Sequence, residues 1–565
     1  MASAHTRITI PPRNPRDTIL LSFAEPHVRG VRRRCRLHAR GSAAAAAAAA
    51  GVAAAVVLPF AAAAQTAAPL TVPEGVPPAF TIHPRIELDE IFTDNASGGV
   101  PGSASSTTTS TSATAAGQVP SASGSANGTD FITRIAPGVG ISEQGARQKL
   151  FADYTAIFDK YARNDNLDKF SNRLFAFGNL EAIQERLFID ATASVSQELI
   201  DQRGPVTGSD RLLSSNETTV STYHVSPYLR LPIGNFADTE LRYGFGQSYS
   251  GALATGTRNE FSAGINSGPD FSRFNWSGVL SDYETDSGTD QQGGVGGNTS
   301  RRLAQVTGKY AIDRVWSPTA SVGYEQIRNG TLGNQPDGPI GSVGVEITPG
   351  PRSKLVLAAN HRYDRNYVSG SGSYEITPNL NALASYSEGI QTTQDQLINN
   401  TSTLGVDEYG NFVDTRTDLP YSPRNSLFGL NNGLGNLAYR QKIGTAALHG
   451  FDDRNTYDAR FTYEQRSSSS SVISSTQESY GVLASFGRSL NPDLRAILTL
   501  QYINTDYGSP DNRNDDLYRG SGSLSYALSE TLHATVTYTY LARLSNAPGA
   551  AVRENTVILG LRKDF

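Results

Sequence analysis

The residues that could perform acid–base or nucleophilic chemistry are scattered along this 565-residue chain. Beyond residue 64 the histidines are His83, His224, His361, His449 and His533, and they fall on widely separated segments. A hydrolase needs a nucleophile, a base and an acid within hydrogen-bond reach of one another. The motifs G-x-S-x-G, H-E-x-x-H and G-x-x-x-x-G-K-S/T, which place catalytic or phosphate-binding groups at fixed spacing, do not occur. The sequence therefore predicts no catalytic residues and a protein that is not an enzyme.

Two segments carry spaced acids or glycines of the kind that bind calcium. "GGVGGN", residues 293–298, is similar to a calcium-binding glycine repeat, but it occurs once and has Asn298 where the repeat has Asp. "DYETDSG", residues 282–288, lacks the Gly and the Glu that an EF-hand requires at its sixth and twelfth positions. The only cysteine, Cys35, lies in a segment that we expect to be removed, so no thiol is left for a disulfide or a metal. We predict no metal site and no cofactor.

Side chains in this chain are positioned by β-strands, because apolar and polar residues alternate through most of it. Between Thr531 and Ala542, one face carries Leu532, Ala534, Val536, Tyr538, Tyr540 and Ala542, and the other carries His533 and four threonines. The same alternation recurs at residues 239–249, 354–364 and 458–466. It is the pattern of strands with two different faces. Outside the N-terminal segment, no run is long and apolar enough for a membrane-spanning helix.

Short turns divide the strand pattern at regular intervals. Seven clear turns lie at residues 232–236, 266–271, 312–318, 347–351, 376–380, 490–494 and 528–532; another lies at 451–455, and weaker ones lie near Glu143 and Gln184. Successive turns are mostly separated by roughly thirty to forty-five residues, enough for two strands and a loop. With both chain ends on one side, ten turns imply eleven hairpins, hence about twenty-two strands, with eighteen or twenty as alternatives.

The connections between these hairpins are longer and rich in Gly, Asp, Asn and Ser. Short turns on one side and long polar loops on the other are typical of bacterial outer-membrane barrels, and Tyr and Phe near strand ends fit their aromatic girdles. A soluble β-sandwich also alternates strands, but it would need domain-sized breaks that this chain lacks. We therefore predict an all-β fold: a transmembrane antiparallel up-and-down β-barrel of residues 80–565, located in the bacterial outer membrane.

The N-terminal residues have the features of a secretory signal peptide. A basic stretch, residues 31–40, precedes an Ala/Val-rich run that ends in an A-x-A cleavage site before Gln65. A transmembrane anchor is the alternative, because the run approaches spanning length. The stretch before the basic residues is long for a signal peptide, and a later start codon would explain it. We assign residues 1–64 to the signal peptide and 65–79 to a Pro-rich periplasmic lead.

The charge balance argues against one class of partner. Residues 1–64 carry nine Arg against Asp17 and Glu25, a net charge of about +7, whereas the whole chain carries −5. The remainder of the chain therefore carries about −12. Such an acidic protein is not expected to bind nucleic acid. At the mouth of a channel, the same charge would favour cations.

The chain ends in "RENTVILGLRKDF", residues 553–565, in which Val557, Leu559, Leu561 and Phe565 fall on one face. A closed barrel has no free edge, so its last strand can stay apolar up to the final residue. The segment resembles the C-terminal recognition strand by which outer-membrane proteins reach the barrel assembly machinery, although Lys563 stands where an apolar residue is usual. We predict that it closes the barrel and acts as an assembly signal.

Longer stretches resemble a family of outer-membrane β-barrel porins. "PRIELDEIFTDNA" (84–96), "FITRIAPGVGIS" (131–142) and "RLFIDATASVSQE" (186–198) resemble its beginning, and residues 437–466 resemble a later hairpin. Members of this family often accompany exopolysaccharide or PEP-CTERM sorting systems. The resemblance implies a barrel that meets outer-membrane lipid and lipopolysaccharide, with polysaccharide export components as possible partners. The family carries no catalytic or binding residues that could be transferred to this chain.

Three functions are compatible with these features. The first is a porin-like channel for hydrophilic solutes. The second is an export conduit or accessory barrel for exopolysaccharide secretion, and the third is a structural or adhesive barrel without an open pore. A TonB-dependent transporter is disfavoured, because the first strand, near Phe80, follows the signal peptide too closely for a plug domain.

A barrel of about twenty-two strands encloses a lumen that wall side chains cannot fill, so we expect a loop to narrow it. Residues 96–129 form a low-complexity loop that we expect to be exposed. The connection at 393–436 instead carries many large apolar residues, too many for a loop surrounded by water. We predict that it folds inward and that the pore constriction contains Tyr409, Phe412, Asp414, Arg416, Asp418 and Tyr421. The alternative is an extracellular cap or adhesive loop.

Overall fold

The structure is a computed structural model that describes residues 79–96, 128–209, 211–212, 214, 216–251, 255–286, 298–329, 335–400, 404–406, 412–414, 419–420, 438–469 and 474–565. The expected signal peptide, the Pro-rich lead up to residue 78 and residues 97–127 of the low-complexity loop lie outside the described residues. The described residues form a closed antiparallel barrel of twenty-two strands. The strand number predicted from the turns is therefore confirmed.

The barrel strands contain 10 to 17 residues, enough to cross a bilayer when tilted, which takes about 9–11 residues. They are β1 (Ala79–Thr93), β2 (Asp130–Gln144), β3 (Gln148–Tyr161), β4 (Lys169–Ile183), β5 (Leu187–Leu199), β6 (Glu217–Ile233), β7 (Ala237–Ser250), β8 (Gly256–Ser267), β9 (Phe274–Asp286), β10 (Thr299–Tyr310), β11 (Trp316–Asn329), β12 (Asp337–Gly350), β13 (Ser353–Arg362), β14 (Arg365–Thr377), β15 (Leu380–Gln391), β19 (Tyr439–Phe451), β20 (Asn455–Ser469), β21 (Ser474–Ser489), β22 (Leu494–Asp506), β23 (Asn514–Ser529), β24 (Leu532–Ser545) and β25 (Val552–Asp564).

Shorter elements lie in the connections. A 3-10 turn, η2 (Asp165–Leu167), joins β3 to β4. Helix α3 (Thr393–Asn400) and a small sheet of β16 (Leu404–Val406), β17 (Phe412–Asp414) and β18 (Leu419–Pro420) lie between β15 and β19. Within the described residues, no helix is long and apolar enough to cross a membrane.

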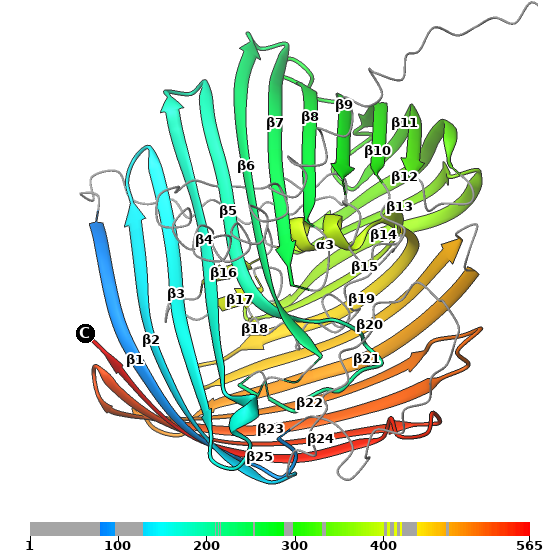
Figure 1. Cartoon of the computed structure of the whole chain (residues 1–565). Helices are drawn as coiled ribbons and strands as arrows, with labels where there is room; N and C mark the ends of the chain where they lie inside the picture. Colours follow the sequence, from blue (N-terminus) through cyan, green and yellow to red (C-terminus); the bar gives the residue numbers. More distant parts are fainter. Residues whose placement is uncertain are drawn as a thin grey trace, which may run out of the picture. The chain divides into compact units, whose positions relative to one another are not determined.

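Each barrel strand pairs with the strands before and after it, so the topology is up-and-down (Figure 1). β15 pairs with β19, because β16 to β18 belong to the connection between them. β25 pairs with β1 and closes the ring, in a register that runs from Arg85 opposite Asp564 to Thr93 opposite Thr556. We call this β1–β25 pairing the seam. A closed single sheet excludes the β-sandwich alternative.

All ten turns expected from the sequence connect neighbouring strands at the end of the barrel where β1 begins and β25 ends. Their residues explain their geometry. In the β6–β7 turn, Gly234 has a φ of +54°, which glycine adopts without steric cost. In the β10–β11 turn, the Asp313 carboxylate accepts hydrogen bonds from the backbone N–H groups of Trp316 and Val315, and these bonds lower the pKa of Asp313. We call this end of the barrel the turn end.

The opposite end carries most of the longer connections, and we call it the loop end. One connection there departs from the expected length. β13 and β14 meet in a two-residue turn at Tyr363 and Asp364, whose φ angles are +58° and +56°. Two consecutive residues with positive φ are the signature of a type I′ hairpin turn, whose twist matches that of the flanking strands.

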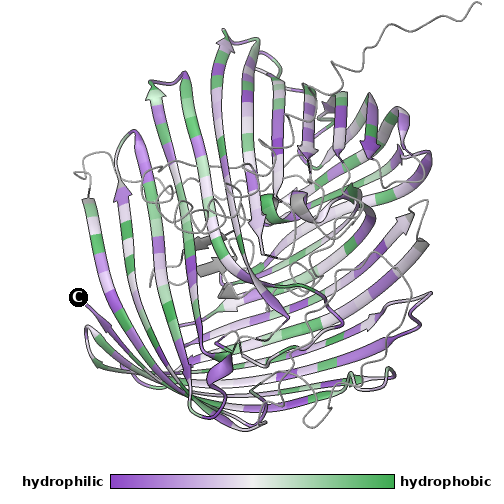
Figure 2. Ribbon diagram, in the orientation of Figure 1, coloured by the Kyte–Doolittle hydropathy of each residue, from purple (hydrophilic) through white to green (hydrophobic). Residues whose placement is uncertain are grey.

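Alternate residues face outward and into the lumen, as the sequence predicts. On β24, the outward Tyr538 is 48% exposed, whereas the inward Leu541 is 2% exposed. Figure 2 shows apolar and polar residues alternating along the strands. Large apolar side chains are exposed on the outward face of most strands, including Leu559, Leu561 and Phe565 of β25. An apolar outside and a polar inside are what a barrel surrounded by lipid requires.

Removal of the last strand should prevent barrel closure. A chain that ends before Asn555 lacks the residues that pair with β1, so the facing edges of β1 and β24 are left open. We expect this variant to be secreted but not assembled. Heat-modifiable gel mobility measures assembly, because a folded barrel migrates differently before and after boiling.

The matched control is Leu559→Ala, which removes an outward side chain of β25 but keeps its backbone pairs. This control should assemble. Normal heat-modifiable mobility of the truncated chain would show that closure does not need β25.

Candidate pore constriction

The inner wall of the barrel carries charged residues that pair within one strand, between neighbouring strands or across one intervening strand. Arg134 of β2 donates to Asp159 of β3 at 2.6 Å. Glu325 of β11 accepts at 2.6 Å from both Arg301 of β10 and Arg362 of β13. Further pairs are Arg85–Asp153, Arg242–Asp190, Arg258–Glu260, Lys309–Glu346 and Arg466–Glu464. Because an unpaired buried charge is costly, these pairs stabilise a polar wall that carries both signs of charge.

The connection between β5 and β6 folds into the barrel. We call residues 200–216 the strap; residues 210, 213 and 215 lie outside the described ones. The strap contacts β1, β25, β24 and β21. In the ring of strands, β21 lies nearly opposite β5, so the strap crosses the lumen (Figure 1).

Leu212 anchors the strap in an apolar cluster at the seam. Its side chain is 1% exposed and packs with Ile91 of β1, Ile132 of β2, Tyr161 of β3 and Ile558 of β25. Burial of a leucine side chain contributes about 1.5–3 kcal/mol to stability. The cluster joins the strap to both strands of the seam.

Two polar contacts reinforce this anchor. The Gly208 N–H donates to the buried Glu554 carboxylate of β25 at 3.0 Å, and Arg211 pairs with the buried Asp89 of β1 at 2.5 Å. A Cβ atom at position 208 would lie 3.2 Å from the side chains of Glu554 and Leu541. Glycine therefore permits the close approach of the strap to the wall.

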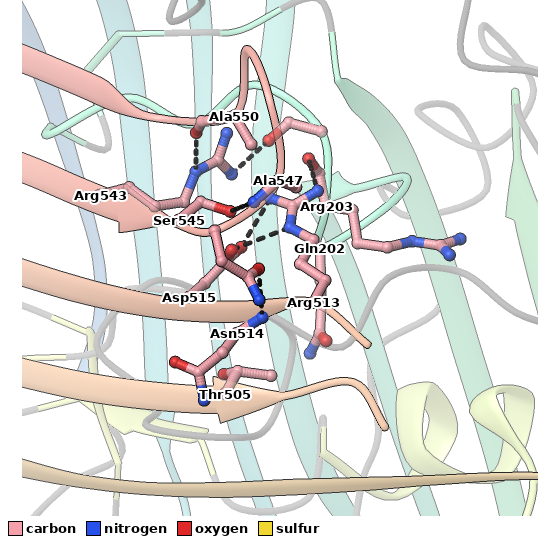
Figure 3. Close-up of polar contacts among 12 residues, drawn as sticks. Gln202, Arg203, Thr505, Arg513, Asn514, Asp515, Arg543, Ser545, Ala547 and Ala550 are labelled. Carbon is pink, nitrogen blue, oxygen red and sulfur yellow. Dashed lines mark hydrogen bonds and ion pairs between the residues drawn. The ribbon is translucent and has the colours of Figure 1, made fainter. Parts of the chain in front are cut away.

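The first residues of the strap are held through their backbone carbonyls (Figure 3). The Gly204 carbonyl accepts a hydrogen bond from Arg543 of β24 at 2.6 Å. The Arg203 carbonyl accepts one from Arg513, in the β22–β23 connection, at 3.0 Å. We call Arg513, Arg543 and these two carbonyls the clasp. It lies at the loop end of the barrel, because Arg513 belongs to a connection on that side.

Side chains of the strap add to the clasp. The Arg203 guanidinium donates to Asp201 at 3.1 Å and to Asp511 of the β22–β23 connection at 2.6 Å. The hydrogen bonds to Asp201, with the nearby charge of Asp511, raise the pKa of Arg203. Gln477 of β21 donates to the side-chain oxygen of Gln202 at 2.8 Å. Residues 201–204 therefore bind to several elements of the facing wall.

Helix α3 is a second inward element. Thr392 precedes it and caps it: its hydroxyl accepts from the Asp395 N–H at 3.1 Å and donates to the Asp395 carboxylate at 2.8 Å. The same carboxylate accepts from Thr285 of β9 at 3.1 Å and lies 3.5 Å from Arg258 of β8. The buried Ile398 faces β7, since a Cβ atom at Gly246 would lie 3.4 Å from its side chain. Helix α3, which follows β15, therefore lies against the inner wall at β6 to β9.

The structure places the residues of the predicted constriction only in part. Phe412 and Asp414 lie on β17, for which the backbone alone is described. Tyr409, Arg416, Asp418 and Tyr421 lie outside the described residues. Their role in a constriction stays a prediction. The assembly signal also stays a prediction; in the structure Leu559, Leu561 and Phe565 are exposed and Val557 is half-buried.

The inward position of the strap was not predicted, because the sequence signal used for an inward loop was a high content of large apolar residues. Residues 200–216 are mostly polar or small; Ile200 and Val206 are isolated apolar residues, and Leu212-Leu213 is an apolar pair. That apolar pair inside a polar loop was the available signal. The buried partners of Leu212 come from four strands, β1, β2, β3 and β25, that are distant in the sequence, so the pair alone did not indicate where the loop would pack.

The histidines do not converge on one site. His224 lies 3.4 Å from Glu260, and His449 lies 2.6 Å from Asp458, on different parts of the wall. In the part of the chain that the structure describes, no three His, Cys, Asp or Glu residues are arranged to hold a metal ion.

Comparison with known proteins agrees with an outer-membrane type of barrel. The model of the family described as "Putative beta-barrel porin 2" matches residues 454–565, which contain β20 to β25. The sequence-based resemblance to porins is thereby confirmed for this C-terminal region. No curated protein matches the chain.

Solved structures with a similar fold include a siderophore receptor and an iron transporter. The siderophore receptor PirA from Acinetobacter baumannii is 8% identical, with a TM-score of 0.46 over 86% of this chain and 80% of that chain. The FrpB iron transporter from Neisseria meningitidis is 9% identical, with a TM-score of 0.46 over 86% and 82% of the two chains. At these identities and TM-scores the likeness carries no argument about solute or mechanism.

Leu212→Ala should destabilise the barrel. Removal of a buried leucine side chain leaves a cavity and typically costs about 2–5 kcal/mol. The temperature at which the folded form converts to the unfolded form on a gel should therefore fall. The control is Leu490→Ala, because Leu490 is exposed in the β21–β22 turn. Equal shifts in the two variants would argue against an apolar anchor at the seam.

Proposed function

We propose that this protein is a porin-like channel of the bacterial outer membrane for small hydrophilic solutes. The observation that carries the proposal is the division of the strands into an outward apolar face and an inward face of hydrogen-bonded charged residues. Such a wall is stable in lipid and can solvate ions and polar solutes. The porin-family match at residues 454–565 supports the same class and a non-enzymatic role.

The strap and α3 narrow this channel. A barrel of twenty-two strands is too wide for its wall side chains to fill. The strap, which crosses the lumen, is anchored to the wall around the seam, and α3 lies against the wall at β6 to β9. Because these two parts of the wall are separate, the elements reduce the lumen from two sides.

A barrel without an open pore is the second candidate. It is favoured by the same two inward elements, which would serve as a plug if they met. Single-channel conductance separates the candidates, since a plugged barrel carries no steady current.

Polysaccharide export is supported by the family resemblance alone. Contact with lipopolysaccharide and with the barrel assembly machinery is proposed for either function, whereas polysaccharide export components would be partners only in export. Neighbouring genes for glycosyltransferases and an export lipoprotein would favour export over passive diffusion.

Replacement of residues 202–207 of the strap with a Gly-Ser linker should raise single-channel conductance. This change removes the side chains of Gln202 and Arg203, which bind Gln477 and Asp511 of the facing wall, and keeps Leu212, so the seam anchor is preserved. The measurement is made on barrels that retain heat-modifiable mobility. Unchanged conductance would place the strap outside the solute path.

A second replacement tests the connection predicted from the sequence. Exchange of Asp395–Asn436 for a similar linker removes most of α3 and the six predicted constriction residues. A rise in conductance is expected if this connection narrows the lumen. An extracellular cap would leave the conductance as it was.

The channel should show a weak cation preference. The chain beyond residue 64 carries about −12, and many of the described arginines of the inner wall are paired with acids. The excess negative charge should therefore act at the channel mouth. The reversal potential in a salt gradient measures this preference. It should weaken from 0.1 M to 1 M salt, as the screening length falls from about 10 Å to about 3 Å; an anion preference would contradict it.

A further inference from the structure

We propose that Arg513 and Arg543 are positioning residues of the constriction, which hold the strap in the lumen from the loop end. This inference rests on the proposed function, because it assigns the control of the channel width to two residues. Neither arginine has to touch the solute. Each acts through the strap carbonyl that it binds.

The clasp recognises the backbone of the strap. Arg543 binds the Gly204 carbonyl and Arg513 binds the carbonyl of the preceding residue, Arg203 (Figure 3). Hydrogen bonds from a charged donor are roughly twice as strong as neutral ones. Two adjacent carbonyls held in this way fix both the position and the direction of the strap as it leaves β5.

Both guanidinium groups are oriented before they reach the strap. Arg513 donates through Nε and Nη2 to the two carboxylate oxygens of Asp515, at 2.8 and 2.6 Å. Arg543 donates through Nε to the Ala550 carbonyl at 2.8 Å. In each case Nη1 is directed to the strap. Arginine suits this role because its planar fork has several fixed donors, whereas lysine offers a single point charge.

The clasp and the seam anchor have separable tasks. The anchor at Leu212 attaches the strap to strands of the wall. In the clasp, the Arg203 carbonyl is bound by Arg513, which belongs to the β22–β23 connection. The Gly204 carbonyl is bound by Arg543, which also binds the Ala550 carbonyl in the β24–β25 connection. The conformation of these loop-end connections therefore sets how far the first part of the strap extends into the lumen.

Arg543→Gln provides the first test. The loss of one charge-assisted hydrogen bond should shift the equilibrium between the held and released strap by roughly ten- to a hundred-fold toward release. Single-channel recordings should show longer or more frequent visits to a higher conductance level. Heat-modifiable mobility should be unchanged, because the seam anchor remains. Arg513→Gln is the second variant and should have the same effect.

A disulfide between the strap and β21, next to the clasp, tests the positioning of the strap directly. Gln202 and Gln477 face each other, with their side chains joined by a 2.8 Å hydrogen bond. In an Arg543→Gln chain that also carries Cys35→Ser, the pair Gln202→Cys and Gln477→Cys should restore the native conductance when oxidised and lose it when reduced. The control pair, Ser321→Cys and Ser342→Cys, joins β11 to β12 away from the strap and should restore nothing.

The outcomes separate this inference from the proposed function. If replacement of residues 202–207 raises the conductance but the two arginine variants conduct like the native chain, the clasp does not position the strap. If the replacement itself has no effect, the constriction by the strap fails instead. Loss of assembly in both arginine variants would also overturn the inference, since it would give the arginines a structural role in the barrel.

Discussion

Closure of the sheet is the constraint on which the rest of the structure depends. In a membrane, each strand N–H and C=O needs a partner, because lipid supplies none. The pairing of β25 with β1 meets this need by joining the two ends of the chain. The strand number, twenty-two, is even because the series of strands starts and finishes at the turn end. The width of the lumen follows in turn from the strand number.

A wide lumen changes what the inward residues must do. In a small barrel, inward side chains fill the interior. In this wide barrel they do not reach the axis, so they line an open space. Charged pairs between neighbouring strands, such as Arg134–Asp159 and Arg301–Glu325, satisfy one another along the wall. These pairs stiffen the wall and keep it polar. They leave the centre to be filled by connections, which are more variable in sequence than strands.

The strap links closure to the channel. Leu212 packs against inward residues of both seam strands, and Glu554 and Asp89 bind the strap from the same two strands. The element that narrows the lumen in the proposed channel thus also braces the place where the chain ends meet. The clasp lies beyond this brace and connects the strap to surface connections at the loop end. Stability and channel width therefore depend on different residues of one segment.

The sequence by itself predicted the ten turns, a strand number of about twenty-two and the direction of most strand residues, because these follow from alternation and from turn residues a few positions apart. It also indicated that the terminal strand closes the ring. Only the tertiary structure decided that residues 200–216 enter the lumen. Arg513 and Arg543 are 310 and 339 residues away from their strap partners, and they meet because the closed ring brings β5 to face the last strands. Composition favoured residues 393–436 as the inward loop, because a high content of apolar residues can be read directly from the sequence. The strap is held through backbone carbonyls, which every residue has, so the sequence carries no sign of these contacts.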